Sequence, residues 1–234
     1  MHKESFNPRF IGLFINPFYF ARRGLYQGIK QLAPLIGGEI LDVGCGVKPY
    51  KNLFQCKSYT GIDVEQSGHP HEKENIDLFY DGHHIPFDDS SFDAVVTFEV
   101  LEHVFHPEEF LSEIKRVLKT GGKLLLTVPF IWDEHEIPYD YGRYSSFGLK
   151  DLLNRQGFKI EIHKKTIASF GVIIQMINAY IYKIIMGKKP GKIKYILIIL
   201  ITGPINLLGS LVAFLLPKNQ DLFLDNIVLA TLVD

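Results

Sequence analysis

Short apolar runs alternate with helical patterns along most of the chain. The runs have the length of buried strands, and the polar stretches between them are rich in glycine, proline and acidic residues. Such alternation predicts an α/β fold with a mainly parallel sheet and helices on both faces. The expected strands are 40–43, 58–63, 76–80, 92–98, 123–128, 158–163 and 226–233, with the last one antiparallel beside the sixth.

Three helices are indicated by their end signals as well as by their periodicity. The first is expected at 18–32. Pro107 opens the second, which is acidic in its first turn and basic near its end at 115–119, as the helix dipole favours. Ser146 is expected to cap the third helix and Gly157 to stop it.

An apolar insertion, residues 168–218, separates the sixth and seventh strands. A helix is expected at 170–186, and 195–216 then contains no charge for 22 residues. Gly203-Pro204 is expected to break this run and leave a helix of about 20 Å, against a hydrocarbon core of about 30 Å. Because the last strand must return to the sheet, only an even number of membrane crossings, or none, is allowed. A re-entrant or surface-lying hairpin is therefore favoured.

Two interpretations of the insertion stay open. Lysines bracket its uncharged run at 195–216, which favours docking on the cytoplasmic face of a membrane; they are Lys188, Lys189, Lys192, Lys194 and Lys218. The other interpretation is a buried cap or a homodimer interface. In either case one face of the second helix is expected to pack closely on the first helix; its residues are Gly203, Asn206, Ser210 and Ala213.

Length and composition indicate one domain, residues 1–234, with an N-terminal arm at 1–34. The arm is interpreted as a cover for a cofactor pocket or as an interfacial anchor. The formal charge of −1 gives no general attraction to nucleic acid, so we expect no nucleic-acid partner. Two cysteines make no disulfide framework, and no cleavage site follows the apolar stretch at 10–20, so a cytoplasmic protein is expected, peripheral on the inner membrane face if the insertion docks there.

The first strand runs into a glycine turn, Gly44-Cys45-Gly46, which is typical of a nucleotide-binding corner. The dinucleotide fingerprint requires a third glycine, and Pro49 stands there instead. This weakens an NAD interpretation. A short helix is expected after it, at 50–54.

Asp42-Val-Gly-Cys-Gly46 resembles the first motif of the class I S-adenosylmethionine-dependent methyltransferases, and Asp63 stands where that family holds the ribose hydroxyls. The resemblance implies a Rossmann-like seven-stranded methyltransferase sheet and S-adenosyl-L-methionine as cofactor. It places Asp81 and Gly82 at the adenine, and the backbone of Phe98 and Glu99 at the methionine ammonium. The cofactor-binding residues implied are Asp42, Gly44, Cys45, Gly46, Asp63, Val64, Asp81, Gly82, Phe98 and Glu99.

Methyl transfer to a hydroxyl needs a base, and histidine is the side chain whose charge changes near neutral pH. His135, in the loop after the fifth strand, is the first candidate and His103 the second; a structural hydrogen-bonding role is the alternative for each.

A divalent metal is a rival interpretation. Glu99-x-x-Glu102-His103, together with His135, resembles a metal-binding segment of some relatives, but Leu-Glu-His is also common in members without metal, so no metal is favoured. His69 and His71, in an expected loop at 65–74, are interpreted as solvated rather than as ligands.

The loop from His135 to Tyr144 resembles the methyltransferase type 11 group, which is common in bacterial surface-polysaccharide and lipid-linked sugar pathways. The resemblance implies a small-molecule, glycan or lipid-linked hydroxyl acceptor bound by Tyr139, Asp140 and Arg143. Arg143 would pair with a phosphate or carboxylate of the acceptor, or instead with Asp140 or Glu136. The alternative function is a catalytically idle cofactor-binding or membrane scaffold protein with the same fold.

Overall fold

The computed structural model describes residues 5–65, 75–187 and 191–233. The chain forms two compact units. We call residues 28–130, 134–164 and 226–234 the α/β unit, and residues 1–27, 131–133 and 165–225 the helical unit. The predicted N-terminal arm and apolar insertion thus contribute to the same unit. The predicted loop at 65–74, with His69 and His71, lies outside the described residues except for its first position.

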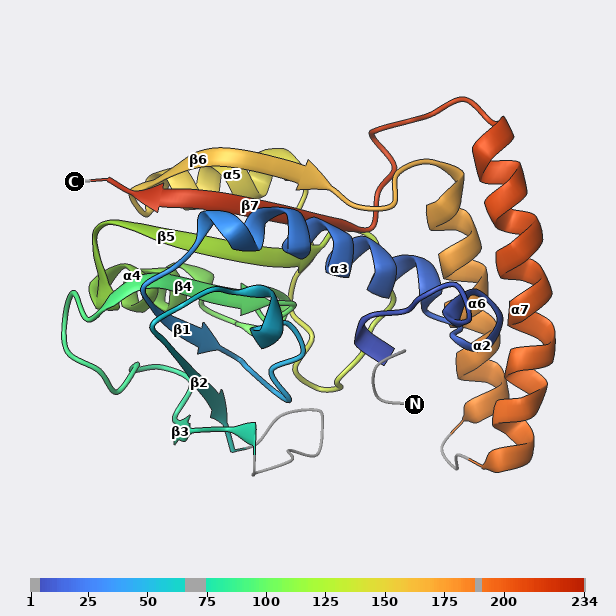
Figure 1. Ribbon diagram of the computed structural model, residues 1–234, viewed down its shortest axis with the longest axis horizontal. Coiled ribbons are helices and arrows are strands. Elements are labelled where there is room, and N and C mark those ends of the chain that lie inside the picture. The colour runs from blue at the N-terminus through green and yellow to red at the C-terminus, as the bar shows by residue number, and fades with distance from the viewer. Residues whose placement is uncertain (1–4, 66–74, 188–190, 234) are drawn as a thin grey trace. The chain divides into compact units, whose positions relative to one another are not determined.

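Seven strands form one sheet in the order β3-β2-β1-β4-β5-β7-β6. β7 runs opposite to its neighbours (Figure 1), so the predicted Rossmann-like methyltransferase topology is confirmed. The strands are β1 (Glu39–Val43), β2 (Ser58–Val64), β3 (Leu78–Tyr80), β4 (Phe92–Phe98), β5 (Leu118–Pro129), β6 (Phe158–Lys165) and β7 (Asp225–Leu232).

The parallel register brings the carboxyl ends of the central strands to one edge of the sheet. Asp42 of β1 pairs with Gly61 on β2 and with Val96 on β4, and Asp63 of β2 pairs with Phe79 on β3. Each strand therefore ends within a few residues of its neighbour. Polar groups that follow these strands must share one region of space.

Two helices, α4 (Pro107–Val117) and α5 (Ser146–Arg155), pack on one face of the sheet, and α3 (Tyr19–Leu32) lies on the other (Figure 1). α4 buries an apolar stripe at helical spacing, namely Phe110, Leu111, Ile114 and Val117. The α/β unit also contains short 3-10 helices at Ala33–Leu35, Lys51–Leu53 and Leu101–His103.

Several predicted element ends were wrong. The cap of α5 is Ser145, whose Oγ accepts a hydrogen bond from the Gly148 amide, and not Ser146. β5 begins at Leu118 rather than 123, because Leu118 pairs with Phe92 across an irregular step in the ladder. β3 begins at Leu78 rather than 76, and the turn after Pro49 forms only a 3-10 helix.

Gly157, the residue predicted to stop α5, has a φ of 86°. This left-handed conformation is the one that glycine commonly adopts just after a helix.

The helical unit contains α2 (Gly12–Ile15), the first part of α3, α6 (Phe170–Met186) and α7 (Lys192–Leu215). The predicted break at Gly203-Pro204 was wrong: α7 is continuous over 24 residues and contains Pro204. At 1.5 Å per residue it is about 36 Å long, so the length argument against a crossing fails. In the described part of the chain, α7 is long and apolar enough to cross a membrane.

Contacts of Asn206, two residues after Pro204, hold α7 against its neighbours where the proline interrupts it. A proline removes one backbone hydrogen bond and usually kinks or ends a helix. Here the buried Asn206 donates to the carbonyls of Leu13 and Asn16 at 2.9 and 3.2 Å, and Asn178 of α6 donates to its Oδ1 at 2.6 Å. These bonds join α7 to α2 and to α6.

The close packing of α7 involves two neighbours rather than one, and it includes Gly209, which was not among the predicted residues. A Cβ at Gly209 would collide with Ile174 of α6, whereas a Cβ at Gly203 would collide with the carbonyl oxygen of Phe14 in α2. Small residues at these positions therefore let both α2 and α6 approach the α7 backbone.

Candidate active site

The glycine turn after β1 is fixed by backbone bonds. Gly44 has a φ of 74°, its amide donates to the carbonyl of Ile62, and a Cβ on it would collide with Val100. Gly46 has a φ of 47°, and a Cβ there would meet nothing within 4 Å. Gly46 therefore faces open space, which allows a ligand to approach the backbone closely.

Asp42 is a buried carboxylate beneath this turn. Its side chain is 2% exposed, and burial raises the pKa of the Asp42 carboxyl to about 7. Oδ2 accepts a hydrogen bond from the Tyr59 hydroxyl at 2.7 Å, while Oδ1 is buried and accepts none from the described residues. A cationic ligand could donate a hydrogen bond to Oδ1, so this position fits a positively charged cofactor.

Three residues of this site were missed from the sequence, namely Tyr59 and the ion pair of Lys48 with Asp77. Lys48 Nζ lies 2.6 Å from Asp77 Oδ2, which also accepts the Gly61 amide at 2.7 Å. A Cβ at Gly61 would collide with Lys48 and Cys45. A glycine inside a strand signals such a close approach and could have indicated the crowded turn.

The other strand ends carry the remaining predicted cofactor residues. Asp63 is 8% exposed, and its two oxygens accept the amides of Gly46 and Val64, both at 2.8 Å. Asp81 Oδ1 accepts the amides of His83 and His84, which lowers the pKa of the Asp81 carboxyl. Asp63 thus orders the glycine turn, and Asp81 orders the segment that begins at Gly82.

Phe98 and Glu99 end β4 at the same edge. Glu99 has a φ of 56°, and its amide donates to Thr127 of β5. The Phe98 ring packs against that of Tyr50 with centroids 5.1 Å apart. The structure therefore gathers the predicted cofactor residues, from Asp42 to Glu99, along one edge of the sheet.

The two candidate bases lie side by side. The rings of His103 and His135 are 4.8 Å apart between centroids, although the residues come from the turn after β4 and the loop after β5. His103 Nδ1 lies 2.6 Å from the carbonyl oxygen of Tyr139, which can only accept, so Nδ1 is the donor in this contact. Backbone bonds from Tyr141 and Gly142 to the Glu102 carbonyl hold the loop on this turn.

Asp140 orients the second histidine. Its Oδ2 accepts the His135 amide at 2.9 Å and lies 3.2 Å from His135 Nδ1. Arg143 binds both Asp140 oxygens, at 2.6 and 2.7 Å. Burial opposes ionisation, but the Arg143 bonds and the His135 amide outweigh it, and the pKa of Asp140 falls to about 2. Of the two roles considered for Arg143, the structure shows the pairing with Asp140.

Three of the four metal candidates converge. Glu102, His103 and His135 each place one ligand atom within 4.8 Å of the others, whereas Glu99 is outside this group. His103 Nε2 is buried, lies 3.8 Å from carboxylate oxygens of Glu102 and Glu136, and has no hydrogen-bond partner among the described residues. This donor set of one carboxylate and two imidazoles is one that a divalent transition metal accepts.

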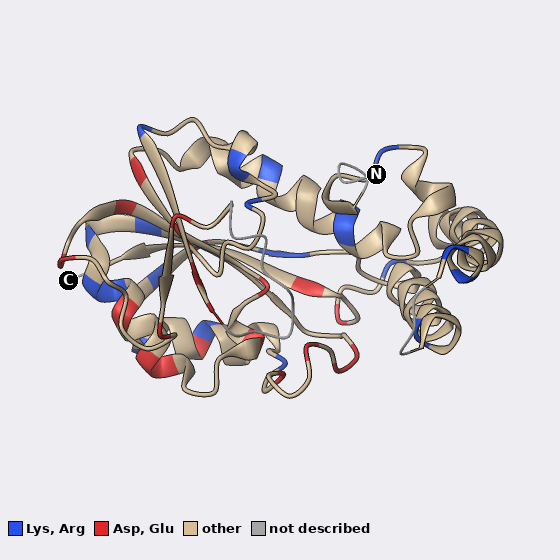
Figure 2. Ribbon diagram, turned by 90° about the horizontal axis from the view of Figure 1, so that it is seen from below, with Lys and Arg blue, Asp and Glu red and all other residues tan. Residues whose placement is uncertain are grey.

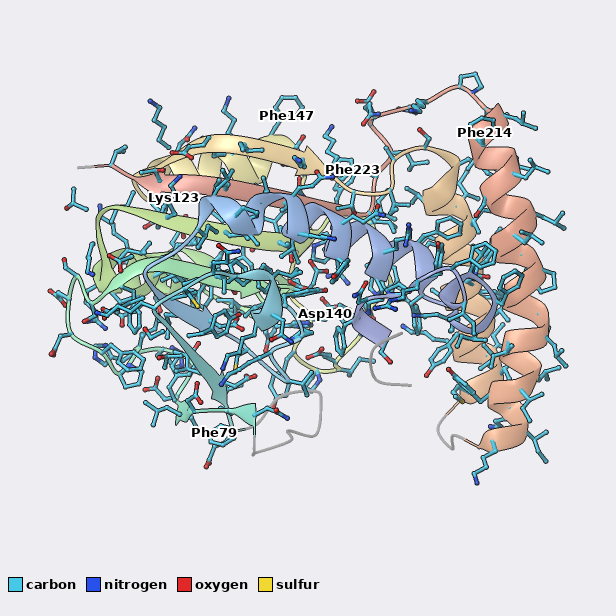
Figure 3. The ribbon with its side chains drawn as sticks, in the orientation of Figure 1. Phe79, Lys123, Asp140, Phe147, Phe214 and Phe223 are labelled. Carbon is cyan, nitrogen blue, oxygen red and sulfur yellow. The ribbon has the colours of Figure 1, made fainter. Side chains whose placement is uncertain are left out.

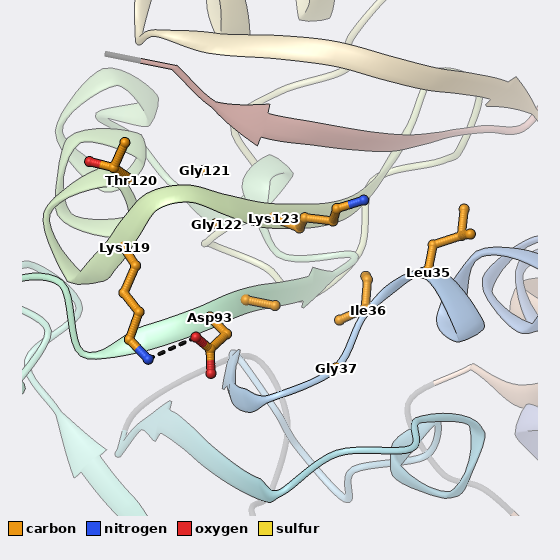
Figure 4. Close-up of a pocket in the computed structure, with 10 residues that line it drawn as sticks. Leu35, Ile36, Gly37, Asp93, Lys119, Thr120, Gly121, Gly122 and Lys123 are labelled. Carbon is orange, nitrogen blue, oxygen red and sulfur yellow. Dashed lines mark hydrogen bonds and ion pairs between the residues drawn. The ribbon is translucent and has the colours of Figure 1, made fainter.

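A cavity of about 290 Å³ lies at the opposite edge of the sheet (Figure 4). Leu35, Ile36, Asp93 and the 119–123 turn line it, and Lys119 Nζ pairs with Asp93 at 2.7 Å. Because Asp93 stands near the amino end of β4, this cavity is separate from the strand-end cluster and contains no predicted site residue.

The sequence matches a family described as "Methyltransferase domain" over residues 41–126, which include the glycine turn and most of the strand-end cluster. Phthiotriol/phenolphthiotriol dimycocerosates methyltransferase of Mycobacterium tuberculosis is 33% identical over 112 residues, 44% of this chain and 42% of that protein. The matched stretch, which is less than half of the chain, is similar to S-adenosylmethionine-dependent methyltransferases. Fatty-acid O-methyltransferase of Mycolicibacterium smegmatis is 31% identical to this chain over 44% of the chain and 41% of the relative.

The chain spans less than half the length of these two curated relatives. Among solved structures, the [4+2]-cyclase SpnF aligns with a TM-score of 0.57 and 20% identity over 89% of this chain and 80% of that one. That likeness shows the fold alone, since one fold serves different reactions.

Proposed function

We propose that the protein transfers a methyl group from S-adenosyl-L-methionine to an oxygen of a lipid-linked acceptor at the cytoplasmic face of a membrane. The observation that carries the proposal is the acidic strand-end cluster around an open glycine turn. Its buried Asp42 oxygen accepts no hydrogen bond from the described residues. A sulfonium cofactor with an ammonium and hydroxyl groups matches this arrangement of carboxylates.

The cofactor would be held by the ends of four neighbouring strands. Asp42 and the Gly44–Gly46 turn would face its charged end, Asp63 its ribose, and Asp81 with Gly82 its adenine. The cofactor, when bound, supplies an electrophilic methyl group on sulfur. The chain contributes binding and alignment, which account for much of the rate in such displacements.

His135 is the proposed base. Asp140, held as a carboxylate by Arg143, faces His135 Nδ1, so the proton stays on Nδ1 and Nε2 is left to accept the hydroxyl proton. His103 is oriented in the same way by the Tyr139 carbonyl and is the second candidate. In this proposal Arg143 and Asp140 position the base, and Tyr139 lies beside the acceptor.

Two observations favour a lipid acceptor over a water-soluble glycan. The relatives named above are a dimycocerosates methyltransferase and a fatty-acid O-methyltransferase. The helical unit also exposes long apolar faces on α6 and α7. An enzyme that rests on a bilayer meets a lipid-linked substrate at high local concentration.

Calorimetry with S-adenosylmethionine and transfer of label from the methyl group to membrane lipid extracts test the proposal. We expect binding and a labelled lipid product. No affinity for the cofactor would refute the enzymatic function, and binding without transfer to any extract would support the idle cofactor-binding protein.

His135→Ala tests the base. General-base catalysis contributes about 10²–10⁴-fold, so we expect kcat to fall by that order while cofactor affinity is kept. His84→Ala, an exposed histidine beside Glu113, is the control. Unchanged turnover by the His135 variant would exclude this role. Activity that survives exhaustive chelation would likewise exclude a metal at Glu102, His103 and His135.

A further inference from the structure

The exposed face of α7 is apolar from Ile193 to Leu215. Its outward positions recur at three- and four-residue intervals, as one stripe of a helix does. Phe214, at the far end of this stripe, is 84% exposed (Figure 3). The stripe consists of Ile193, Ile196, Leu197, Leu200, Pro204, Leu207, Leu208, Leu211, Val212, Phe214 and Leu215.

The buried face of the same helix contains polar and small residues beside one isoleucine, Ile198. Thr202 and Asn206 have no exposed surface, and Gly203 and Gly209 lie beside them. In α6, Gln175 and Asn178 are fully buried together with apolar residues, whereas Ile177 and Ile184 are exposed. Both helices thus bury polar side chains and expose large apolar ones, which is unlike a helix that meets water.

The N-terminal segment belongs to the same assembly. Gln175 donates to the carbonyl of Pro17 and accepts the amide of Ala21, both at 3.1 Å, and Asn206 binds the end of α2. Phe10 and Ile11, at the start of α2, are 74% and 57% exposed. The buried amides therefore hold a second apolar element against the helix pair.

The charge of this region has one sign. No aspartate or glutamate occurs between residues 166 and 220, while lysines occur at 183, 188, 189, 192, 194 and 218. Figure 2 shows no acidic ribbon on α6 or α7, in contrast to the many acidic segments elsewhere. A surface that is apolar and bordered mainly by lysines, of which Lys183 pairs with Asp133 at 2.7 Å, complements an anionic bilayer.

We propose that the helical unit docks on an anionic lipid bilayer as a hairpin lying in the plane of one leaflet, with the α6 and α7 stripes and Phe10–Ile11 among the acyl chains and the lysines at the headgroups. This inference rests on the membrane location in the proposed function, but it does not depend on methyl transfer.

The lysines decide between a lying and a crossing hairpin. Five of them fall between residues 183 and 194, a stretch of the sequence that runs from the last part of α6 to the start of α7. A crossing hairpin would carry this stretch through the hydrocarbon to the far side, against the distribution of positive charge in membrane proteins. The base of the hairpin is closed by Thr166 and Asp225, which bond through backbone and side chains, so both ends remain on one side.

Flotation of the full chain with phosphatidylcholine vesicles, with and without phosphatidylglycerol, tests the docking. We expect at least tenfold more bound protein on the anionic vesicles. The double variant Leu207→Glu with Leu211→Glu should lose this binding. A matched control, Leu35→Glu with Phe147→Glu, places the same charges on exposed residues of the α/β unit and should bind like the wild type.

Cofactor binding in mild detergent shows which proposal fails. A variant that binds S-adenosylmethionine but does not float is folded and supports the docking surface. Wild-type protein that binds the cofactor but does not float, and sediments as a dimer through this surface, overturns it. Flotation without cofactor affinity would instead refute the proposed function and leave the docking intact.

A cysteine at the hairpin turn tests the orientation. In Gly191→Cys protein carrying Cys56→Ser, the remaining Cys45 is buried. A membrane-impermeant maleimide added outside protein-loaded vesicles should label Cys at the turn at once. Protection until detergent is added would show that the turn has crossed and would overturn the in-plane arrangement.

Discussion

The α/β unit and the helical unit differ in which side chains they bury and which they expose. In α4 the buried stripe is Phe110, Leu111, Ile114 and Val117, and the outer face begins with Glu108 and Glu109. In α7 the buried stripe includes Thr202 and Asn206, and the outer face is leucine and isoleucine. Exposed side chains are polar where they meet water and apolar where they meet lipid. Both patterns follow from this rule if the α/β unit meets water and the outer face of α7 meets lipid.

The largest effect is expected from the apolar core of the α/β unit. Ile114 is fully buried in the main hydrophobic cluster. Ile114→Ala should lower the free energy of unfolding by about 2–5 kcal/mol, through lost transfer free energy and the cavity left behind. Urea denaturation measures the change. A loss below 1 kcal/mol would mean that this core is not what stabilises the unit.

The polar core of the helical unit should respond to the loss of an amide. Asn206→Ala leaves two carbonyls and the Asn178 side chain without their bonds to this residue. We expect a loss of about 2–3 kcal/mol, because each buried group left unsatisfied is costly. Hydrogen exchange of α2 and α7 amides in detergent locates the loss. If exchange rises in the α/β unit instead, the two units are not independent.

Cofactor affinity should depend on the α/β unit alone. Asp63→Asn removes the charge from a carboxylate that accepts the Gly46 and Val64 amides and would hold the cofactor ribose. Affinity for S-adenosylmethionine should fall about 10- to 100-fold, the range for hydrogen bonds to charged groups. Calorimetry with the exposed Asp151→Asn as control checks this. Equal affinities for the two variants would remove Asp63 from the site.

The pH dependence of cofactor binding should report Asp42. Its carboxyl has a pKa of about 7 because of burial, and a cation binds better to the ionised form. Affinity should therefore rise about tenfold from pH 6 to pH 8, with proton release on binding below pH 7. Calorimetry in buffers of different ionisation enthalpy measures both. Asp42→Asn should flatten the profile, and a wild-type profile that is already flat would contradict the assignment.

The smallest effect sharpens the contrast between the units. Leu208 is 62% exposed on the apolar face of α7. In detergent, Leu208→Ser should change the free energy of unfolding by less than about 0.5 kcal/mol, as at an ordinary exposed position. A thermal melt beside the wild type checks this. A large loss would show that the face is covered in the soluble protein.

The sequence predicted the strand-end cluster well, because apolar runs followed by glycine or aspartate locate the ends of strands without any tertiary information. It could not predict element ends that depend on a partner. Leu118 joins β5 because Phe92 lies opposite. Pro204 stays inside α7 because Asn206 binds Leu13 and Asn16, which lie far away in the sequence.

The candidate active site shows the same limit. His103 and His135 were each identified as chemically capable, but their proximity depends on how the loop after β5 folds over the turn after β4. Tyr59 was missed because a tyrosine in a strand has many ordinary uses, and only the register places its hydroxyl at Asp42.

The Thr166–Asp225 clasp has a consequence for how such a protein can change. Thr166 exchanges backbone bonds with Leu224 and Asp225, and its hydroxyl reaches the Asp225 carboxylate at 2.6 Å. The entropic cost of closing a loop grows only with the logarithm of its length. The free energy of joining Thr166 to Asp225 therefore depends little on how many residues lie between them. The apolar insertion can therefore be lengthened, exchanged or removed while β6 and β7 keep their places in the sheet.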